Sequence, residues 1–160
     1  MINKQLSEQL LHFFQNYLLF YKEFLSIETE KFEDLSHNNL RSLDDRVKQE
    51  QAYLLKLRGL EIEREKLVGE TGDSKTTFRQ LIPMFEEPYR KEMKAIYDEL
   101  SNVLLDLREM NRRCNYLTEI KLHNVEVTLN KIKNNPELQN MYNAKAKEGK
   151  IPPSVLSMKI

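Results

Sequence analysis

The sequence is poor in the residues that build disulfide-linked or loop-rich proteins. Its 160 residues include one cysteine, four glycines, five prolines and no tryptophan. The single cysteine, Cys114, cannot form an internal disulfide, and so few glycines and prolines argue against a loop-rich or all-β fold. Of the residues present, 31% are charged and 40% are hydrophobic. Helix-forming residues dominate, which predicts a soluble, all-α protein.

The chain also lacks an excess of charge and any long apolar run. Its 25 basic and 25 acidic side chains cancel, so no field is available to gather nucleic acid or an anionic membrane surface. The first stretch, "MINKQLSEQLLHFFQNYLLF", has polar residues where a signal peptide needs an apolar centre. No run reaches membrane length. These absences predict a cytoplasmic protein without a nucleic-acid partner and without stable insertion into a membrane.

The positions of the prolines leave two long stretches, residues 1–82 and 89–135, free to form helices. In the first, apolar residues recur at spacings of three and four, which is one face of a helix. This stripe covers so much of the helix that more than one neighbour must bury it. Ser36, Asn38 and Asn39 then interrupt the pattern and predict a turn, because their side chains compete for backbone hydrogen bonds.

Beyond this turn the pattern predicts a second helix, a short connecting helix and a third, longest helix. The second stripe begins at Leu40 and ends at "GETGDSKTT". Thr77 and Gln80 have the spacing of a capping box, which predicts a short helix that Pro83 ends. Pro88 suits the first position of a helix that continues to about Asn134. We expect the three long helices to form an antiparallel bundle, or coiled-coil hairpin.

The predicted helix lengths do not match. At 1.5 Å per residue the three long helices measure about 50, 43 and 70 Å, so the third should project beyond its neighbours from about Leu117. We therefore expect one bundle domain over residues 1–135 and a C-terminal segment, 136–160, with a short helix and a mobile tail. An exposed apolar stripe on a helix is typical of a docking surface for another amphipathic helix. The projecting part would expose Leu122, Val125, Leu129 and Ile132.

No set of residues predicts catalysis or a bound cofactor. Cys114 and His123 are nine residues apart, about 13 Å along one helix, and cannot share a metal ion. The sequence has no glycine-rich phosphate loop and no nucleophile elbow. Cys114 lies at an apolar position in the middle of a helix, which favours a packed thiol over a reactive one. We expect no enzyme, no metal and no cofactor.

Two further groups of side chains have alternative interpretations. The aromatic residues of the first helix are expected to fill the core between the first and third long helices, rather than to form an exposed groove. Asn111 and Asn115, one helical turn apart, either face solvent or fix the register of a helix–helix contact with a partner. The aromatic residues concerned are Phe13, Phe14, Tyr17, Phe20, Tyr21 and Phe24.

Most of residues 8–142 resemble FlgN-type flagellar export chaperones. The stretch "LLKLRGLEIEREKLVGETG" is similar to the family's leucine-leucine-glutamate-arginine helix that ends in a glycine. Its matching residues are Leu57, Leu60, Glu61, Arg64 and Leu67. In "MNRRCNYLTEIKLHNVEVTLNKI", Asn111, Asn115 and Leu117 resemble the family's paired asparagines ahead of a leucine. Tyr142, followed by polar residues and Gly149, resembles a later tyrosine of the family.

The resemblance implies a helical cytoplasmic chaperone of the flagellar type III export system. Such proteins bind the C-terminal helices of hook-filament junction proteins, also called hook-associated proteins, keep them from assembling early and bring them to the export gate. Tyr142 would then contact the export machinery. The implied client-binding residues are Asn111, Asn115, Leu117, Ile120, Leu122, Val125, Leu129 and Ile132.

A coiled-coil scaffold is the alternative interpretation. It would form an obligate homodimer through the third long helix, whereas a chaperone would be a monomer or a weak homodimer that a client helix stabilises.

Overall fold

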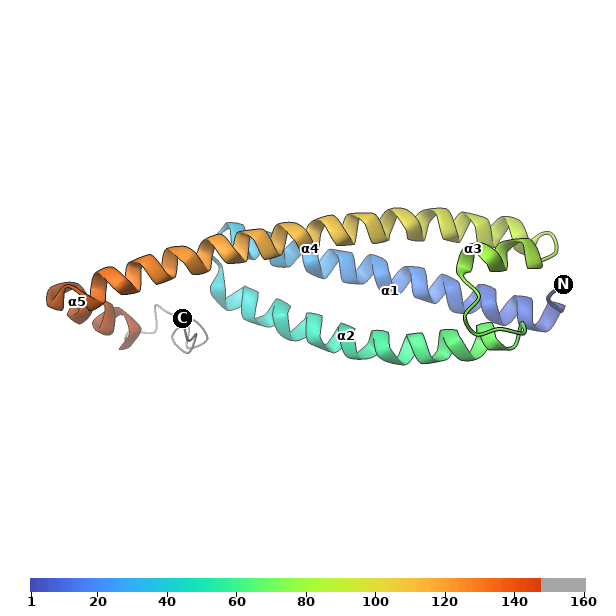
Figure 1. The fold of residues 1–160 in the computed structure, drawn as a ribbon, viewed down its shortest axis with the longest axis horizontal. Helices are drawn as coiled ribbons and strands as arrows, with labels where there is room; N and C mark the ends of the chain where they lie inside the picture. Colours follow the sequence, from blue (N-terminus) through green and yellow to red (C-terminus); the bar gives the residue numbers. More distant parts are fainter. Residues whose placement is uncertain (148–160) are drawn as a thin grey trace.

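The computed structural model describes residues 1–147, and every regular element in this range is a helix (Figure 1). The prediction of an all-α fold is therefore confirmed for this part of the chain. Three helices are long, and the longest has 45 residues. The predicted mobile tail falls largely outside the described residues. The elements are α1 (Lys4–Ser36), α2 (Leu40–Gly69), α3 (Phe78–Leu81), the 3-10 helix η1 (Ile82–Met84), α4 (Tyr89–Lys133) and α5 (Pro136–Lys147).

Side-chain caps define where the first three helices begin. The Asn3 side chain accepts a hydrogen bond of 2.8 Å from the backbone N–H of Leu6, and Asn39 caps α2 in the same way. Thr77 and Gln80 form the predicted capping box in both directions. Each cap satisfies an N–H group that the first turn of a helix leaves without a backbone partner.

The asparagine-rich turn between α1 and α2 reverses the chain (Figure 1). Asn38 has a φ of 55°, a left-handed conformation that asparagine adopts more readily than most residues. The backbone N–H of Asn39 donates to the carbonyl of Asp34 at 2.9 Å. These two features close the turn and send α2 back along α1.

Helix α1 lies between α2 and α4 and packs against both (Figure 1). α4 runs parallel to α1 and antiparallel to α2. Within residues 1–147, α2 and α4 have no extensive contact with each other. The three long helices thus form a layer with α1 in the middle, which explains why α1 is apolar on two sides.

The main hydrophobic core lies at the end of the molecule where α1 begins and α2 ends. Phe14 of α1 is buried, and its ring stacks on that of Phe78 with the centroids 4.1 Å apart. Farther along α1, Phe20 stacks on Tyr53 of α2 at 5.4 Å. The aromatic residues of α1 are therefore core residues, as predicted, but they pack against α2 and α3 as well as filling the space beside α4. The fully buried side chains of this core include Leu10, Val68, Leu81, Phe85 and Met93.

Candidate functional site

The far end of α4 projects beyond the α1–α2 turn, and α5 folds back beside it (Figure 1). Ile132, near the end of α4, is only 9% exposed. The expectation that Ile132 forms part of an exposed stripe is therefore wrong. The sequence pattern identified an apolar face on α4, but the last turn of that face is covered by the protein itself.

Between the projecting part of α4 and the α1–α2 turn lies a groove with a volume of about 680 Å³. We call it the distal groove. Its walls come from the end of α1, the start of α2, α4 and α5. Its volume falls in the range typical of binding sites. The groove is lined by Leu35, Asn38, Leu40, Leu43, Asp44, Val47, Thr118, Lys121, Leu122, Asn124, Val125, Thr128, Leu129 and Tyr142.

The α4 wall of the groove follows from helical spacing. Leu122, Val125 and Leu129 are separated by three and four residues and therefore share one face. The hydroxyl of Thr128 donates to the carbonyl of Asn124 at 2.9 Å. This bond inside the helix satisfies the hydroxyl, so the threonine adds little polarity to the wall.

One polar contact joins α4 to the turn at the edge of the distal groove. The Lys121 ammonium donates to the side-chain carbonyl of Asn38. Both residues line the groove, and Asp44 adds a carboxylate to the α2 wall. The groove is thus apolar along its walls and carries polar groups of both charges among its lining residues.

The structure separates the residues predicted from the sequence into two groups. Leu122, Val125 and Leu129 are half-buried and line the groove, as does Tyr142. The other five do not line it: Ile132 is buried, Leu117 is half-buried, and three are exposed. These exposed residues are Asn111, Asn115 and Ile120.

Sequence reasoning did not include the opposite wall in the site. Leu35, Leu40, Leu43 and Val47 come from the two sides of the turn. Leu40, Leu43 and Val47 belong to the second apolar stripe of the sequence, but the stripe by itself does not indicate a site. The signal that could have identified this wall is the spacing of Leu40, Leu43 and Val47, three and four residues apart, directly after the turn beyond which α4 projects.

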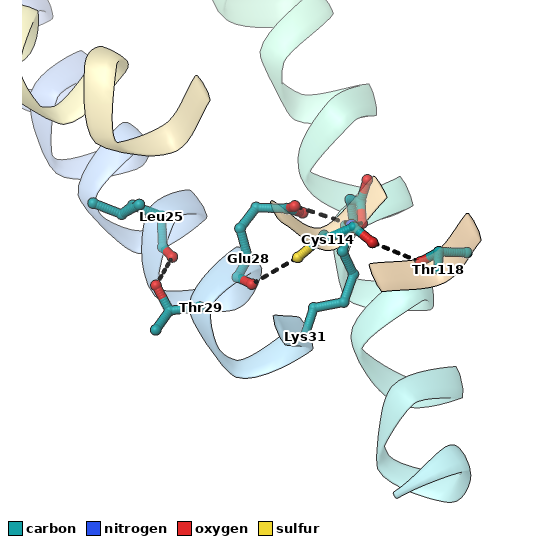
Figure 2. A network of polar contacts seen from close by, with 7 residues as sticks. Leu25, Glu28, Thr29, Lys31, Cys114 and Thr118 are labelled. Carbon is teal, nitrogen blue, oxygen red and sulfur yellow. Dashed lines mark hydrogen bonds and ion pairs between the residues drawn. The ribbon is translucent and has the colours of Figure 1, made fainter. Parts of the chain in front are cut away.

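A buried charged cluster joins α1 to α2, and Figure 2 shows two of its residues, Glu28 and Lys31. Glu28 is 1% exposed, and its carboxylate is 2.9 Å from the Lys31 ammonium. Lys31 also contacts Glu50 of α2 at 2.6 Å. Burial raises the pKa of Glu28, and the Lys31 charge opposes this rise. Burial alone would lower the pKa of Lys31, but Glu50 and Glu28 outweigh it and raise that pKa.

Cys114 of α4 packs against this cluster (Figure 2). Its thiol donates to the backbone carbonyl of Glu28 at 3.5 Å, and its side chain is buried. Burial raises the pKa of the Cys114 thiol to about 11. Because the thiolate is the reactive form, this environment favours an inert thiol, which agrees with the interpretation from the sequence.

We expect Cys114 to react slowly with a disulfide reagent at pH 7.5. A thiol pKa two units above its ordinary value of 9.0 lowers the thiolate fraction about 100-fold, and burial adds a steric barrier. Absorbance of the released thiolate, measured with the folded protein and with the protein in urea, checks this. Equal rates under the two conditions would contradict a packed thiol.

Residues 1–147 show no sign of a metal centre or of a helix that spans a membrane. No group of three or more histidine, cysteine, aspartate or glutamate side chains in this range is placed to hold a metal ion. None of the described helices combines the length and apolarity that crossing a membrane requires. The distal groove is lined mainly by aliphatic side chains.

Comparison with known proteins identifies the family of the chain. Residues 1–150 match the family model described as FlgN protein. No match was found among curated proteins or among solved structures. The match covers all the described helices and both walls of the distal groove. The chain therefore belongs to the FlgN family, a family of flagellar chaperones.

Proposed function

We propose that this protein is a cytoplasmic export chaperone that binds the C-terminal amphipathic helices of hook-associated proteins in the distal groove. The observation that carries the proposal is the groove itself, whose apolar walls come from four separate helices. An amphipathic helix lays its apolar face in such a groove through residues at positions i, i+3, i+4 and i+7. Covering that face in the cytoplasm would keep the client from assembling early.

The polar lining supports reversible binding. Lys121, Asn124 and Asp44 interrupt the apolar walls and limit the apolar area that a client can bury. Burying apolar area favours association, but ordering the client and the side chains of the groove costs free energy. Only the difference between the two appears as binding affinity. A chaperone that delivers its client must release it, so a moderate affinity suits this role.

Tyr142 connects the groove to the proposed delivery of the client to the export gate. Its resemblance to the family's tyrosine implies contact with the flagellar type III export gate. In this structure Tyr142 is half-buried among the residues of the groove. A client in the groove would touch or displace this ring, so client binding and gate binding would share one residue.

We expect the double substitution Val125→Asp and Leu129→Asp to weaken client binding at least about 100-fold. Two carboxylates would have to lose water against the apolar face of the client, which costs several kcal/mol. The thermal midpoint should change little, because neither side chain belongs to the buried core. Titration calorimetry with a synthetic C-terminal helix of a hook-associated protein from the same genome measures the change.

Ile120→Asp is the matched control. Ile120 is exposed on the same part of α4 but does not line the groove, so this variant should bind the peptide as the unaltered protein does. Loss of binding in Ile120→Asp alone would place the client on another face of α4. Obligate dimerisation through α4, with no effect of the peptide on the melting curve, would favour the scaffold interpretation.

A further inference from the structure

Helix α2 carries a second apolar stripe on the side that faces away from α1. Leu55 is 69% exposed and Ile62 is 71% exposed. Together with Ala52 and Gly59, which are also exposed, they follow spacings of three, four and three residues. This is the spacing of a coiled-coil seam. The inner seam of α2, with Leu57, Leu60 and Leu67, already packs against the core. We call the four residues Ala52, Leu55, Gly59 and Ile62 the outer stripe.

No contact within residues 1–147 explains why position 59 is a glycine. Glycine in the middle of a helix weakens that helix relative to alanine. A Cβ atom at position 59 would meet nothing within 4 Å, and the residue does not have a positive φ. Neither close packing nor backbone conformation therefore requires glycine here. A flat position between two exposed aliphatic side chains is suited to receive a side chain from another helix that approaches closely.

The charges beside the outer stripe favour a second copy of the same helix. Arg58 and Glu65 flank the stripe on one side, and neither has an ion-pair partner within residues 1–147. Suppose that a second copy of α2 lies antiparallel to the first, with its Ile62 opposite Gly59. Arg58, which flanks the stripe, then lies near Glu65 of the second copy. The twofold axis repeats each contact with the roles of the two copies exchanged, so two Gly59–Ile62 contacts and two Arg58–Glu65 ion pairs form together.

A parallel pair is less favourable for the same residues. It would place Gly59 opposite Gly59 of the second copy, which leaves a gap, and Lys66 opposite Lys66 of the second copy, which brings like charges together. In the antiparallel arrangement Lys66 instead meets Leu55 of the second copy, and its aliphatic stem can cover the leucine while the ammonium stays in water.

We propose that the protein self-associates through the outer stripe of α2, with the two helices antiparallel. The contact involves one helix from each copy and is narrow, so association is weak and reversible. It does not depend on the proposed client. The walls of the distal groove lie outside the outer stripe, so each copy keeps its groove.

Sedimentation equilibrium of the full chain, with a reducing agent and from about 1 µM to about 1 mM protein, tests this. The unaltered protein should show a reversible monomer–dimer equilibrium. Arg58→Glu and Glu65→Arg should each weaken dimerisation about tenfold or more, because each places like charges opposite one another. The combined variant, Arg58→Glu with Glu65→Arg, should restore it. Circular dichroism should show unchanged helix content in all three.

Gly59→Gln separates the dimer contact from the fold. Glutamine is the better helix former, so the thermal midpoint at low concentration should rise, while the added side chain blocks Ile62 of the second copy and dimerisation is lost. A protein that stays monomeric up to the highest concentration would overturn the proposal. So would dimerisation that is insensitive to Gly59→Gln, or a combined charge swap that fails to restore what the single changes removed.

Discussion

Replacing Phe14 with alanine is expected to lower the free energy of unfolding by about 3–5 kcal/mol. The Phe14 side chain is 2% exposed and stacks on Phe78 from the connecting segment. It also makes an edge contact with Phe13. Its removal leaves a cavity at the junction of α1 and α3, where the rigid helices cannot collapse to fill the space. Urea denaturation followed by circular dichroism measures the loss.

Leu19→Ala is the matched control for this prediction. Leu19 lies on the same helix but is 55% exposed, so its truncation should change the free energy of unfolding by no more than about 0.5 kcal/mol. Equal losses at the two positions would show that the contribution of α1 does not depend on burial in this core.

Replacing Lys31 with methionine is expected to cost about 3–5 kcal/mol at pH 8, because it leaves the buried Glu28 carboxylate without its cation. The ammonium lies within 2.9 Å of Glu28 and also pairs with Glu50. Without it, two carboxylates remain close together in a site from which Glu28 cannot reach water. Denaturation at several pH values measures the effect.

The loss should shrink as the pH falls. Burial already raises the pKa of Glu28 above its ordinary value of 4.5, and Lys31 opposes that rise, so the variant raises the pKa further. A carboxyl with a higher pKa in the folded state than in the unfolded state binds its proton more tightly when folded. Stability therefore falls as the pH rises above about 4.5 and recovers as the pH returns to that value.

A compensating change provides the control. Adding Glu28→Gln to Lys31→Met removes the buried charge and should recover much of the stability at pH 8. It should also flatten the pH dependence. If Lys31→Met were as stable as the unaltered protein at pH 8, or equally destabilised at pH 4.5 and pH 8, the buried ion pair would not have the role assigned to it.

The helices were predictable because their signals are local. The spacing of apolar residues in α1, the asparagines at the turn and the capping box at Thr77 each depend on neighbours a few residues away. The polar residues within the stripe of α2 were harder to interpret. Glu50 meets Lys31, and Glu61 accepts a hydrogen bond from the hydroxyl of Tyr17. These partners lie on α1 and cannot be identified from spacing within α2.

The candidate site was predictable on one wall only. Leu122, Val125 and Leu129 follow from the periodicity of α4 and from its excess length. The opposite wall depends on how tightly Asn38 turns the chain, and the burial of Ile132 goes with the path of α5 back along α4. The tightness of the turn and the path of α5 depend on the directions of the helices in space, and the spacing of residues along one helix does not predict those directions. The predicted single domain over residues 1–135 stays a prediction.

The continuous helix α4 joins two regions that differ in how firmly they are packed. At one end it is anchored by the aromatic and aliphatic core, and at the other it carries half of an open groove. Sequence changes in the groove therefore need not weaken the anchored end. If the groove holds a client, as we propose, evolution could change that client while the folded frame stays the same.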